Sequence, residues 1–358
     1  MRILVLANDS VGLYLFRLDL LKEVLKTNEV YISLPSGKYI EELERAGCKF
    51  IDTHMERRGM NPKTDISLFK HYLNILAEVQ PNLVITYTIK PNIYGGLACT
   101  VRKIPYAVNI TGLGTAFQGN GALRQMVTAM YKVALKKAKV VFFENSANRD
   151  LFIGEKIVRI QQACLLNGAG VNLQKFPYEE YPKNDVFHFL YIGRVMKEKG
   201  IDELFEAMKG LIAEGQNCFL DVVGPFEEDY KDKLGKYEQE GWLKYHGFQG
   251  DVRPFIKACD CFVLPSYHEG MANTNLECAS SGRPIITSNV PGCKEAIICG
   301  KTGFLCEPKN IDSLYSMMLQ MLEISRSERE DMGKAGRKHM EELFDKKAVI
   351  EKTICRMI

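Results

Sequence analysis

Short apolar runs alternate with longer amphipathic segments along the whole chain, in two successive series. In the first series the segments between the runs repeat their apolar positions every three or four residues. The pattern predicts strands at 2–7, 30–34, 48–52, 83–87, 106–110 and 140–144, and helices at 12–27, 64–79 and 120–138. Alternation of this kind is typical of a parallel sheet with helices on both faces.

The alternation stops at residues 167–184, which are rich in glycine and proline, and then begins again. The second series predicts strands at 187–192, 218–223, 243–246, 261–264 and 284–287, helices at 201–214, 228–240, 252–258 and 274–281, and only helices from there to the C-terminus. Two series in 358 residues indicate two domains, since one compact core rarely extends over so long a chain.

We therefore predict two Rossmann-like, doubly wound α/β domains that face a central cleft. The expected parts are an N-terminal domain at 1–166, a linker at 167–184, a C-terminal domain at 185–340 and a C-terminal helix at 341–358 that can cross back to the first domain. Sheets of this type bind ligands outside the carboxyl ends of their strands, so the site is expected there.

Composition favours a cytoplasmic globular protein. No apolar run approaches the roughly 20 residues needed to cross a bilayer, and the first apolar stretch is too short for a signal peptide. The eleven cysteines are odd in number and contain no CxxC pair. We interpret them as reduced, buried hydrophobic residues and not as metal or redox sites.

Charge is unevenly divided along the chain. Residues 1–166 contain 22 Lys+Arg and 14 Asp+Glu, a balance of +8, whereas the whole chain carries only +3. Within the basic half, residues 121–139 place apolar side chains on one side of a helix and several lysines around it. This segment has two interpretations: a domain helix packed by its apolar side, or a helix that docks peripherally on anionic lipid of the cytoplasmic membrane.

Two cations stand in the predicted loop between a strand and a helix, in the stretch Gly193-Arg194-Val-Met-Lys-Glu-Lys199-Gly200. A guanidinium can hold two phosphate oxygens, a lysine adds a point charge, and a helix N-terminus adds free amides. On their own, these residues fit a solvated loop equally well. About 70 residues further on, two carboxylates, Glu269 and Glu277, flank the start of another predicted helix.

The carboxylate pair also has two interpretations. Glu269 can accept hydrogen bonds from sugar hydroxyls, and Glu277 can accept the two vicinal hydroxyls of a ribose. The alternative is a helix capped by Asn273 with a glutamate in its first turn. The combination of both motifs, each after an apolar strand, favours a site for an activated sugar.

The chain resembles the retaining glycosyltransferases of family 4, which have the two-domain GT-B fold, over nearly its whole length. The motifs in the second series are Gly193-Arg194-x4-Lys199-Gly200, Asp221-Val-Val-Gly224, Cys261-Phe-Val-Leu-Pro265-Ser266, Glu269-x7-Glu277, Gly282-Arg-Pro-Ile-Ile286, Val290-Pro-Gly292 and Gly303-Phe-Leu305. In the first series, Tyr87-Thr-Ile-Lys-Pro-Asn92 and Thr111-Gly-Leu-Gly-Thr-Ala-Phe117 resemble the branch that builds bacterial capsule and exopolysaccharide.

The resemblance implies that the domain at 1–166 binds the acceptor and that the domain at 185–340 binds the nucleotide-sugar donor. It also implies roles for the matching residues. Arg194 and Lys199 would neutralise the diphosphate leaving group, and Glu269 would bind the donor sugar; these three form the expected catalytic set. The further donor-binding residues would be Gly12, Gly193, Phe248, Gln249, Gly270, Met271, Ala272, Asn273, Thr274 and Glu277. Of these, Glu277 would hold the ribose, Phe248 and Gln249 would read the nucleobase through their backbone, and Gly12 would approach the phosphate.

One departure from the family pattern concerns the first domain. Many members carry a histidine near the reacting carbon, whereas here the matching stretch, Val108–Gly112, has none. Thr111, Gly112 or a backbone carbonyl takes its place on the acceptor side, or the role is absent. Among the six histidines only His268 lies inside a motif, where it either touches the ligand or is an ordinary loop residue. There is no DxD motif, so neither a metal nor a cofactor is expected.

We therefore expect a glycosyltransferase whose donor substrate is a nucleotide-sugar. The resemblance favours UDP as the nucleotide. The expected acceptor is a saccharide or a lipid-linked (polyprenyl diphosphate) saccharide, and no nucleic acid partner is expected. Two alternatives remain at this point. One is a nucleotide-sugar epimerase or a phosphorylase of the same fold, which would not transfer the sugar to a saccharide acceptor. A non-catalytic scaffold would bind no nucleotide, although it would have no reason to keep Arg194, Lys199, Glu269 and Glu277.

Overall fold

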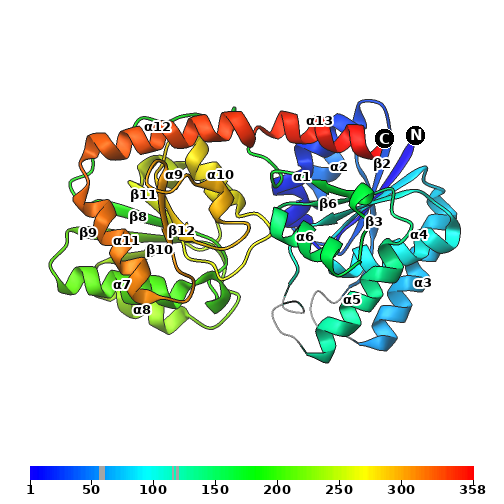
Figure 1. The fold of residues 1–358 in the computed structure, drawn as a ribbon, viewed down its shortest axis with the longest axis horizontal. Coiled ribbons are helices and arrows are strands. Elements are labelled where there is room, and N and C mark those ends of the chain that lie inside the picture. Colours follow the sequence, from blue (N-terminus) through cyan, green and yellow to red (C-terminus); the bar gives the residue numbers. More distant parts are fainter. Residues whose placement is uncertain (56–60, 115–116, 118–120) are drawn as a thin grey trace. The chain divides into compact units, whose positions relative to one another are not determined.

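The computed structural model describes residues 1–55, 61–114, 117 and 121–358, and it divides into two α/β units (Figure 1). The first unit contains Met1–Ala169 together with Ala348–Ile358, and the second contains Gly170–Lys347. Residues 115 and 116 of the Thr111–Phe117 motif, and residue 120 of the predicted helix at 120–138, lie outside the described residues.

The first unit is built on a seven-stranded sheet in the order β3-β2-β1-β4-β5-β6-β7, with every pair parallel. Its strands are β1 (Arg2–Leu6), β2 (Glu29–Leu34), β3 (Lys49–Asp52), β4 (Leu83–Tyr87), β5 (Tyr106–Ile110), β6 (Val140–Phe143) and β7 (Ala163–Leu165). Its helices are α1 (Ser10–Leu25), α2 (Ile40–Arg45), α3 (Pro62–Val79), α4 (Gly96–Arg102), α5 (Ala122–Leu135), α6 (Ser146–Gly154) and α13 (Lys346–Met357), with a π-helix at Pro91–Gly95.

Successive residues of the central strands enter two different cores. Leu4 and Leu6 of β1 pack with α3, α4 and α5, whereas Ile3 and Val5 pack with α1, α2 and α13. Figure 1 shows these two groups of helices on opposite sides of the sheet. Both faces are thus covered, which is why the strands are continuous apolar runs with no polar alternation.

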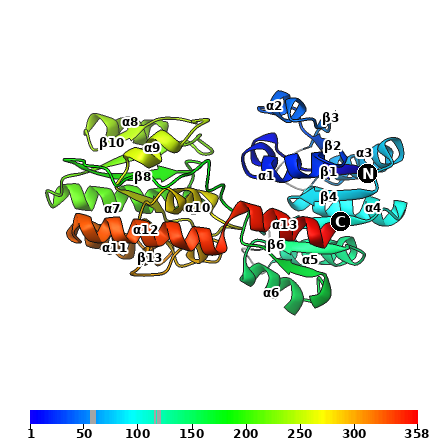
Figure 2. The same ribbon diagram turned by 90° about the horizontal axis from the view of Figure 1, so that it is seen from above.

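The second unit has a six-stranded parallel sheet in the order β10-β9-β8-β11-β12-β13, which Figure 2 shows with β10 at one edge and β13 at the other. Its strands are β8 (Phe187–Ile192), β9 (Cys218–Val223), β10 (Leu243–Tyr245), β11 (Cys261–Leu264), β12 (Ile285–Ser288) and β13 (Gly303–Cys306). Its helices are α7 (Ile201–Ala213), α8 (Lys231–Gln239), α9 (Arg253–Ala258), α10 (Asn273–Ser280), α11 (Ile311–Glu323) and α12 (Arg326–Leu343), with 3₁₀ turns at Lys197–Lys199 and Lys294–Ala296.

The predicted fold class is confirmed, and two strands were missed. β13 lies where only helices were expected after residue 287, and β7 lies where no strand was expected. Both are short: β13 has four residues and begins with glycine, and β7 has three. Runs of this length carry too few side chains to show a period, so sequence pattern alone does not reveal them.

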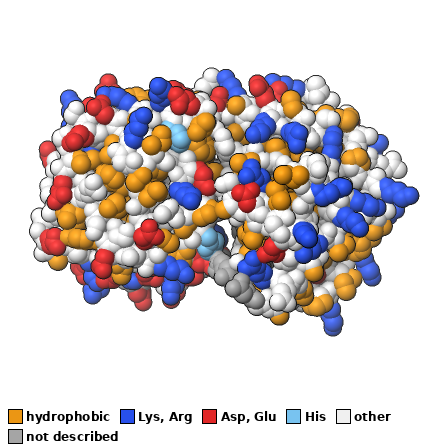
Figure 3. All heavy atoms as spheres, viewed as in Figure 1, with side chains coloured by type: hydrophobic (Ala, Val, Ile, Leu, Met, Phe, Trp, Pro, Cys, Tyr) orange, Lys and Arg blue, Asp and Glu red, His pale blue; other side chains and the backbone are white. Residues whose placement is uncertain are grey.

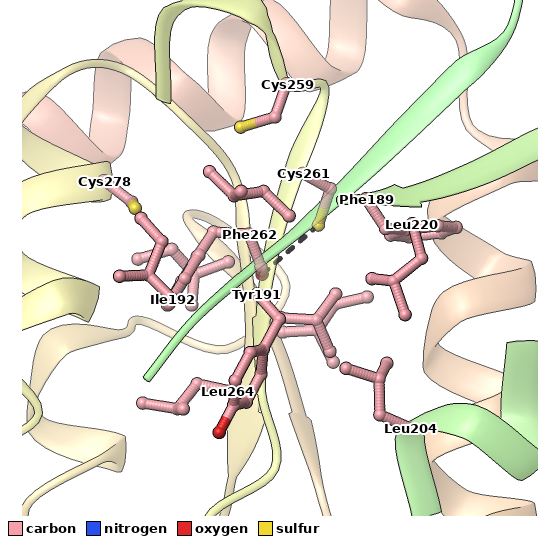
Figure 4. Close-up of a cluster of buried hydrophobic side chains, with 14 of the residues drawn as sticks. Phe189, Tyr191, Ile192, Leu204, Leu220, Cys259, Cys261, Phe262, Leu264 and Cys278 are labelled. Carbon is pink, nitrogen blue, oxygen red and sulfur yellow. Dashed lines mark hydrogen bonds between the residues drawn. The ribbon is translucent and has the colours of Figure 1, made fainter. Parts of the chain in front are cut away.

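The core of the second unit contains six of the eleven cysteines. Figure 4 shows Cys259, Cys261 and Cys278 among Phe189, Phe262 and their apolar neighbours. All eleven cysteines are free thiols, and nine of them are buried. Burial raises the pKa of the Cys261 and Cys278 thiols well above the usual value, so these groups are inert hydrophobic side chains.

Candidate active site

The loops that follow β8 and β11 lie at the point where the strand order of the second sheet reverses. β8 and β11 are hydrogen-bonded neighbours although β9 and β10 come between them in sequence. Ligands of open α/β sheets bind outside the carboxyl ends of the strands at such a point. The predicted cations follow β8 and the carboxylate of Glu269 follows β11, so these groups lie at the position where a ligand is expected.

Lys199 and Glu269 are in direct contact in these loops. Nζ of Lys199 pairs with Oε1 of Glu269, and the two side chains are only 17% and 14% exposed. Oγ of Ser266 donates to the same oxygen at 2.8 Å. Burial acts to raise the pKa of Glu269, but Lys199, Ser266 and His268 outweigh it, so that pKa lies below its usual range. Glu269 is thus ionised at neutral pH and can accept hydrogen bonds.

Two glycines permit the close approach of the chain segments that carry this pair. Gly200 has φ +70°, and a Cβ there would lie 2.1 Å from the carbonyl oxygen of Pro265. Gly292 has φ +86°, and a Cβ there would lie 2.6 Å from the carbonyl oxygen of Glu269. No side chain larger than hydrogen fits either position without displacing backbone. The sequence thus holds the Lys199 loop and the Glu269 loop against each other.

Arg194 lies in the same loop as Lys199, and its side chain is more accessible than that of Lys199. Its side chain is 40% exposed, and Nη1 lies 3.6 Å from Oε2 of Glu227, in the loop that follows β9. The buried hydroxyl of Tyr191 donates to the Arg194 carbonyl oxygen at 2.7 Å and fixes the backbone from which the guanidinium extends. In Figure 4 the hydroxyl of Tyr191 points away from the apolar cluster that surrounds its ring.

The N-terminus of α10 is not capped by a side chain. The N-cap residue is Ala272, and Asn273 is the first helical residue, so the alternative interpretation of Asn273 as the cap is wrong. Oδ1 of Asn273 is buried without a partner among the described residues. The amide of Ala272 donates to Gly292 O at 2.7 Å, so it is already occupied. The first-turn amides of Asn273 and Thr274 remain candidates for anion binding, because a helix start leaves such donors unpaired.

Glu277 lies one turn further along α10 and forms no ion pair with any described residue. Burial raises its pKa to about 7, and the positive charges of Lys175 and Lys346 offset this only in part. A carboxylate kept in such an unfavourable place, without a partner, is a candidate for ligand binding. The predicted neighbours Gly270, Met271 and Ala272 lie in the buried segment just before the helix.

The predicted nucleobase loop follows β10 at the same edge of the sheet. Phe248 is 37% exposed. Nε2 of Gln249 donates to the carbonyl oxygen of His246 at 2.6 Å, so the side chain of Gln249 folds back on its own loop. The loop is therefore compatible with recognition of the nucleobase through its backbone groups, as the resemblance implies. Gly193 begins the neighbouring loop, where its amide donates to Val223 O at 2.9 Å.

The remaining predicted residues belong to the first unit. Gly12 lies in the first turn of α1, where its amide donates to Oδ2 of the capping residue Asp9 at 3.1 Å. That amide is therefore engaged within the helix start. Thr111 and Gly112 directly follow β5 and are half-buried. The side chain of His268, in the second unit, is 40% exposed, with Nε2 3.6 Å from Oε2 of Glu198.

Some buried polar groups were not singled out from the sequence. In the first unit Arg17 pairs with Glu144, and Lys90 Nζ lies 2.9 Å from Asp65 Oδ1, with all four side chains largely buried. In the second unit one carboxylate, on Asp221, contacts two histidines. The partners lie far apart in sequence, so nothing local indicates these contacts, although Lys90 and Asp221 each lie inside a family motif. Among the described residues no group of three or more His, Cys, Asp or Glu is arranged to hold a metal ion.

Two family models match the chain. Residues 175–339 match the family described as glycosyl transferases group 1, and residues 2–145 match the family described as glycosyl transferase 4-like. The chain belongs to the group 1 glycosyltransferases. The predicted family, the GT-B fold and the enzyme class, a nucleotide-sugar-dependent hexosyltransferase, are thereby confirmed.

Curated relatives extend over most of the chain. The N,N'-diacetylbacillosaminyl-diphospho-undecaprenol α-1,3-N-acetylgalactosaminyltransferase of Campylobacter jejuni is 28% identical over 341 residues, which cover 90% of each chain. The capsular polysaccharide biosynthesis glycosyltransferase CapM of Staphylococcus aureus is 25% identical over 371 residues, which cover 97% of this chain and 94% of CapM.

Solved structures share the fold. Anabaena HepE in complex with UDP-glucose aligns with a TM-score of 0.81 at 18% identity and covers 99% of each chain. A glycosyltransferase from Rickettsia africae aligns with a TM-score of 0.80 at 18% identity, covering 99% of this chain and 96% of its own.

Proposed function

We propose that this enzyme transfers a sugar from a UDP-sugar to a lipid-linked saccharide during assembly of a bacterial surface glycan. The observation that carries the proposal is the contact of Lys199 with Glu269, beside Arg194, at the reversal of strand order in the second sheet. This arrangement supplies cations for a diphosphate and a carboxylate for sugar hydroxyls at adjacent positions.

The donor and the acceptor are inferred from relatives. A relative from Escherichia coli, 28% identical over 283 residues, is named as a UDP-Gal:α-D-GlcNAc-diphosphoundecaprenol α-1,3-galactosyltransferase. The Campylobacter jejuni relative is also named for a diphospho-undecaprenol acceptor, and HepE was solved with UDP-glucose. A UDP-sugar and a polyprenyl diphosphate acceptor are therefore the substrates we assign to this chain.

The chemistry follows from where charge develops. As the bond between the sugar and the diphosphate breaks, negative charge grows on the diphosphate, where Arg194, Lys199 and the free amides of α10 stabilise it. Glu269 orients the sugar through its hydroxyls, and Glu277 binds the ribose. The new glycosidic bond forms to the acceptor oxygen, and an oxygen of the departing diphosphate takes the proton of that hydroxyl. Transfer on one face of the sugar retains the anomeric configuration.

The acceptor is assigned to the first unit, with Thr111 and Gly112 as the candidate contacts at the carboxyl end of β5. The missing family histidine makes backbone groups there the available partners. Neither a metal nor a cofactor has a step in this scheme, because Arg194 and Lys199 provide the positive charge that the diphosphate requires.

Peripheral contact with the membrane is the third part of the proposal, and α5 supports it. The helix packs through Val127, Tyr131 and Ala134, but Leu123, Met126 and Val133 are 45%, 45% and 61% exposed. The predicted single apolar side is thus split, with half of it facing solvent. The helix contains no acidic residue, and the exposed Lys132, Lys136 and Lys137 flank the apolar side chains. Exposed apolar groups among lysines match an anionic lipid surface.

The surface of the first unit agrees with this assignment. Figure 3 shows more basic side chains over the first unit, to the right, and acidic ones more often over the second. No helix among the described residues is long and apolar enough to cross a membrane.

Transfer is tested by supplying a panel of UDP-sugars with and without a polyprenyl-diphosphate-linked saccharide and following products by NMR. The donor should persist until the acceptor is added, and Arg194→Ala and Glu277→Ala should each reduce turnover by at least about 100-fold, or 2.7 kcal/mol in the barrier. Conversion of the donor alone would indicate an epimerase instead. Near-normal turnover in both variants would contradict the assigned site.

Membrane contact is tested by co-sedimentation with vesicles of phosphatidylglycerol or of phosphatidylcholine. Binding should require the anionic lipid and be lost when Lys132, Lys136 and Lys137 are changed to Gln. A matched control removes three exposed lysines from the second unit, with Lys231, Lys244 and Lys301 changed to Gln. Equal loss in both triple variants would show a general charge effect and not a docking helix.

A further inference from the structure

Three neighbouring strands of the second sheet contribute to one hydrogen-bonded group, the His188–Asp221–His246 cluster. Asp221 on β9 accepts from Nδ1 of His188 on β8 at 2.9 Å and from Nε2 of His246, just after β10, at 2.7 Å. The side chains of His188, Asp221 and His246 are 34%, 20% and 17% exposed. No role has been assigned to this cluster so far.

The protonation of the cluster is fixed by its chemistry. Burial acts to raise the pKa of Asp221, but the bonds from the two imidazoles outweigh it and lower that pKa, so Asp221 is ionised. An ionised carboxylate only accepts hydrogen bonds. His246 therefore carries its proton on Nε2 and His188 on Nδ1, and each ring is locked in one tautomer and one orientation.

His246 is also the first residue of the predicted nucleobase loop, residues 246–250. Its amide donates to Val222 O at 2.9 Å, and its carbonyl oxygen accepts from Nε2 of Gln249 at 2.6 Å. The ring of Phe255 in α9 packs against its imidazole, with centroids 4.7 Å apart. The carboxylate, the imidazole and the loop thus form one connected unit.

Two further bonds connect the end of β10 and the loop to Gly224, which directly follows β9. The amide of Gly224 donates to Gly247 O at 2.8 Å, and Oη of Tyr245 donates to Gly224 O at 2.9 Å. The loop is therefore fixed to β9 on both sides of His246, by main chain and by side chain. Several bonds to one short segment suit a loop whose backbone must present groups in fixed positions.

We infer that Asp221, acting through His246, is a positioning residue that holds the loop of Phe248 and Gln249 in the orientation that selects the nucleobase of the donor. The inference rests on the proposed function, since it concerns the same donor site. His188 lies on the opposite side of Asp221 from the loop. Its own amide donates to Oδ2 of Asp260 at 2.9 Å, so it anchors the cluster to the start of β11.

The test measures binding of UDP and of GDP by calorimetry to the full chain and to three variants. His246→Phe keeps a ring against Phe255 but loses the donor to Asp221. We expect about tenfold weaker UDP binding and a smaller preference for UDP over GDP. His246→Gln restores an N–H near the position of Nε2 and should stay within about threefold of the unaltered chain. His188→Phe removes the other imidazole and should change neither value more than about twofold.

The outcomes separate this inference from the proposed function. Unchanged UDP affinity and base preference in His246→Phe, or equal losses in His188→Phe, would overturn the inference alone, because a purely structural cluster would respond to either ring. Loss in His246→Gln as large as in His246→Phe would also contradict it. No UDP binding by the unaltered chain would overturn the proposed function and the inference with it.

Discussion

Lys199 and Glu269 form a largely buried ion pair although 70 residues separate them in sequence. Each follows a different strand, and the two strands are neighbours only because the sheet reverses its order between β8 and β11. The pair is thus a product of topology. It also neutralises, within the chain, the two groups to which we assign the diphosphate and the sugar of the donor.

The pair should show strong coupling in stability. Lys199→Met or Glu269→Gln leaves one buried charge without its partner, which costs about 2–4 kcal/mol of unfolding free energy. The double variant removes both charges, so its loss should be smaller than the sum of the single losses by about 1–3 kcal/mol. The only tryptophan, Trp242, is buried in the second unit, so its fluorescence in urea reports the unfolding of that unit. Additive losses would show that the two side chains do not interact.

Glu227 should compete with the donor for Arg194. Its Oε2 lies 3.6 Å from Nη1 of Arg194, so a bound diphosphate must replace it. An exposed pair of this kind contributes up to about 1 kcal/mol, and Glu227→Gln should therefore tighten UDP binding up to about fivefold. Asp229→Asn removes the same charge from an exposed position two residues away and serves as the control. Equal effects of both changes would indicate bulk electrostatics and not competition.

Donor affinity should rise with pH through the titration of Glu277. Its pKa of about 7 means that the carboxyl is mostly protonated at pH 6 and mostly ionised at pH 8. Only the ionised form accepts both ribose hydroxyls, so UDP should bind about tenfold more tightly at pH 8. 2′,3′-Dideoxyuridine diphosphate lacks those hydroxyls and controls for titration of the phosphate itself. The same pH dependence for both ligands would exclude Glu277 as the ribose partner.

The same pKa makes Glu277 costly for stability. Its folded-state pKa is raised above the unfolded value, so ionisation opposes folding as pH rises above about 4.5. Glu277→Gln should therefore stabilise the second unit at pH 8, by roughly 1–3 kcal/mol, while it abolishes ribose binding. Urea unfolding at pH 8 and at pH 5 checks the direction of this effect, because the gain in unfolding free energy should largely disappear at pH 5. A loss of stability at pH 8 would contradict the assignment of an unpaired, desolvated carboxylate.

Gly200 should be irreplaceable for a reason other than its φ angle. Gly200→Ala places a Cβ against Pro265 O and pushes the Lys199 loop away from Glu269. Gly215 has a similar φ, +78°, but a Cβ there meets nothing within 4 Å. Gly215→Ala should thus cost only about 1 kcal/mol, whereas Gly200→Ala should cost clearly more and reduce transfer at least about tenfold. Equal effects on both measurements would show that the contact with Pro265 does not position the site.

Much of the fold could be predicted from sequence because both sheets are buried on both faces. Burial turns each central strand into a continuous apolar run, so β1, β4 and β8 were predicted within one residue of their observed ends. The edge strand β13 and the three-residue β7 carry no such run. The donor-binding candidates of the second unit come from motifs in the segments after β8, β10 and β11, which are strands that sequence pattern also predicts.

Contacts between side chains on different strands could not be predicted from the sequence pattern. Nothing local indicates that Glu227 reaches Arg194, that Asp221 joins His188 to His246, or that Asp9 occupies the amide of Gly12. Each depends on the order of strands or on the exact helix start. The interpretation of Asn273 as a cap failed for the same reason, because the helix begins one residue earlier than a capping asparagine requires.

Calorimetric titration of UDP into the unaltered chain, Arg194→Met and Lys199→Met tests the assigned donor site most directly. The account predicts one UDP site per chain, with affinity reduced at least about tenfold in each variant, since each charge-assisted contact to phosphate contributes about 1.5–3 kcal/mol. UDP binding that is absent from the unaltered chain, or unchanged in both variants, would contradict it.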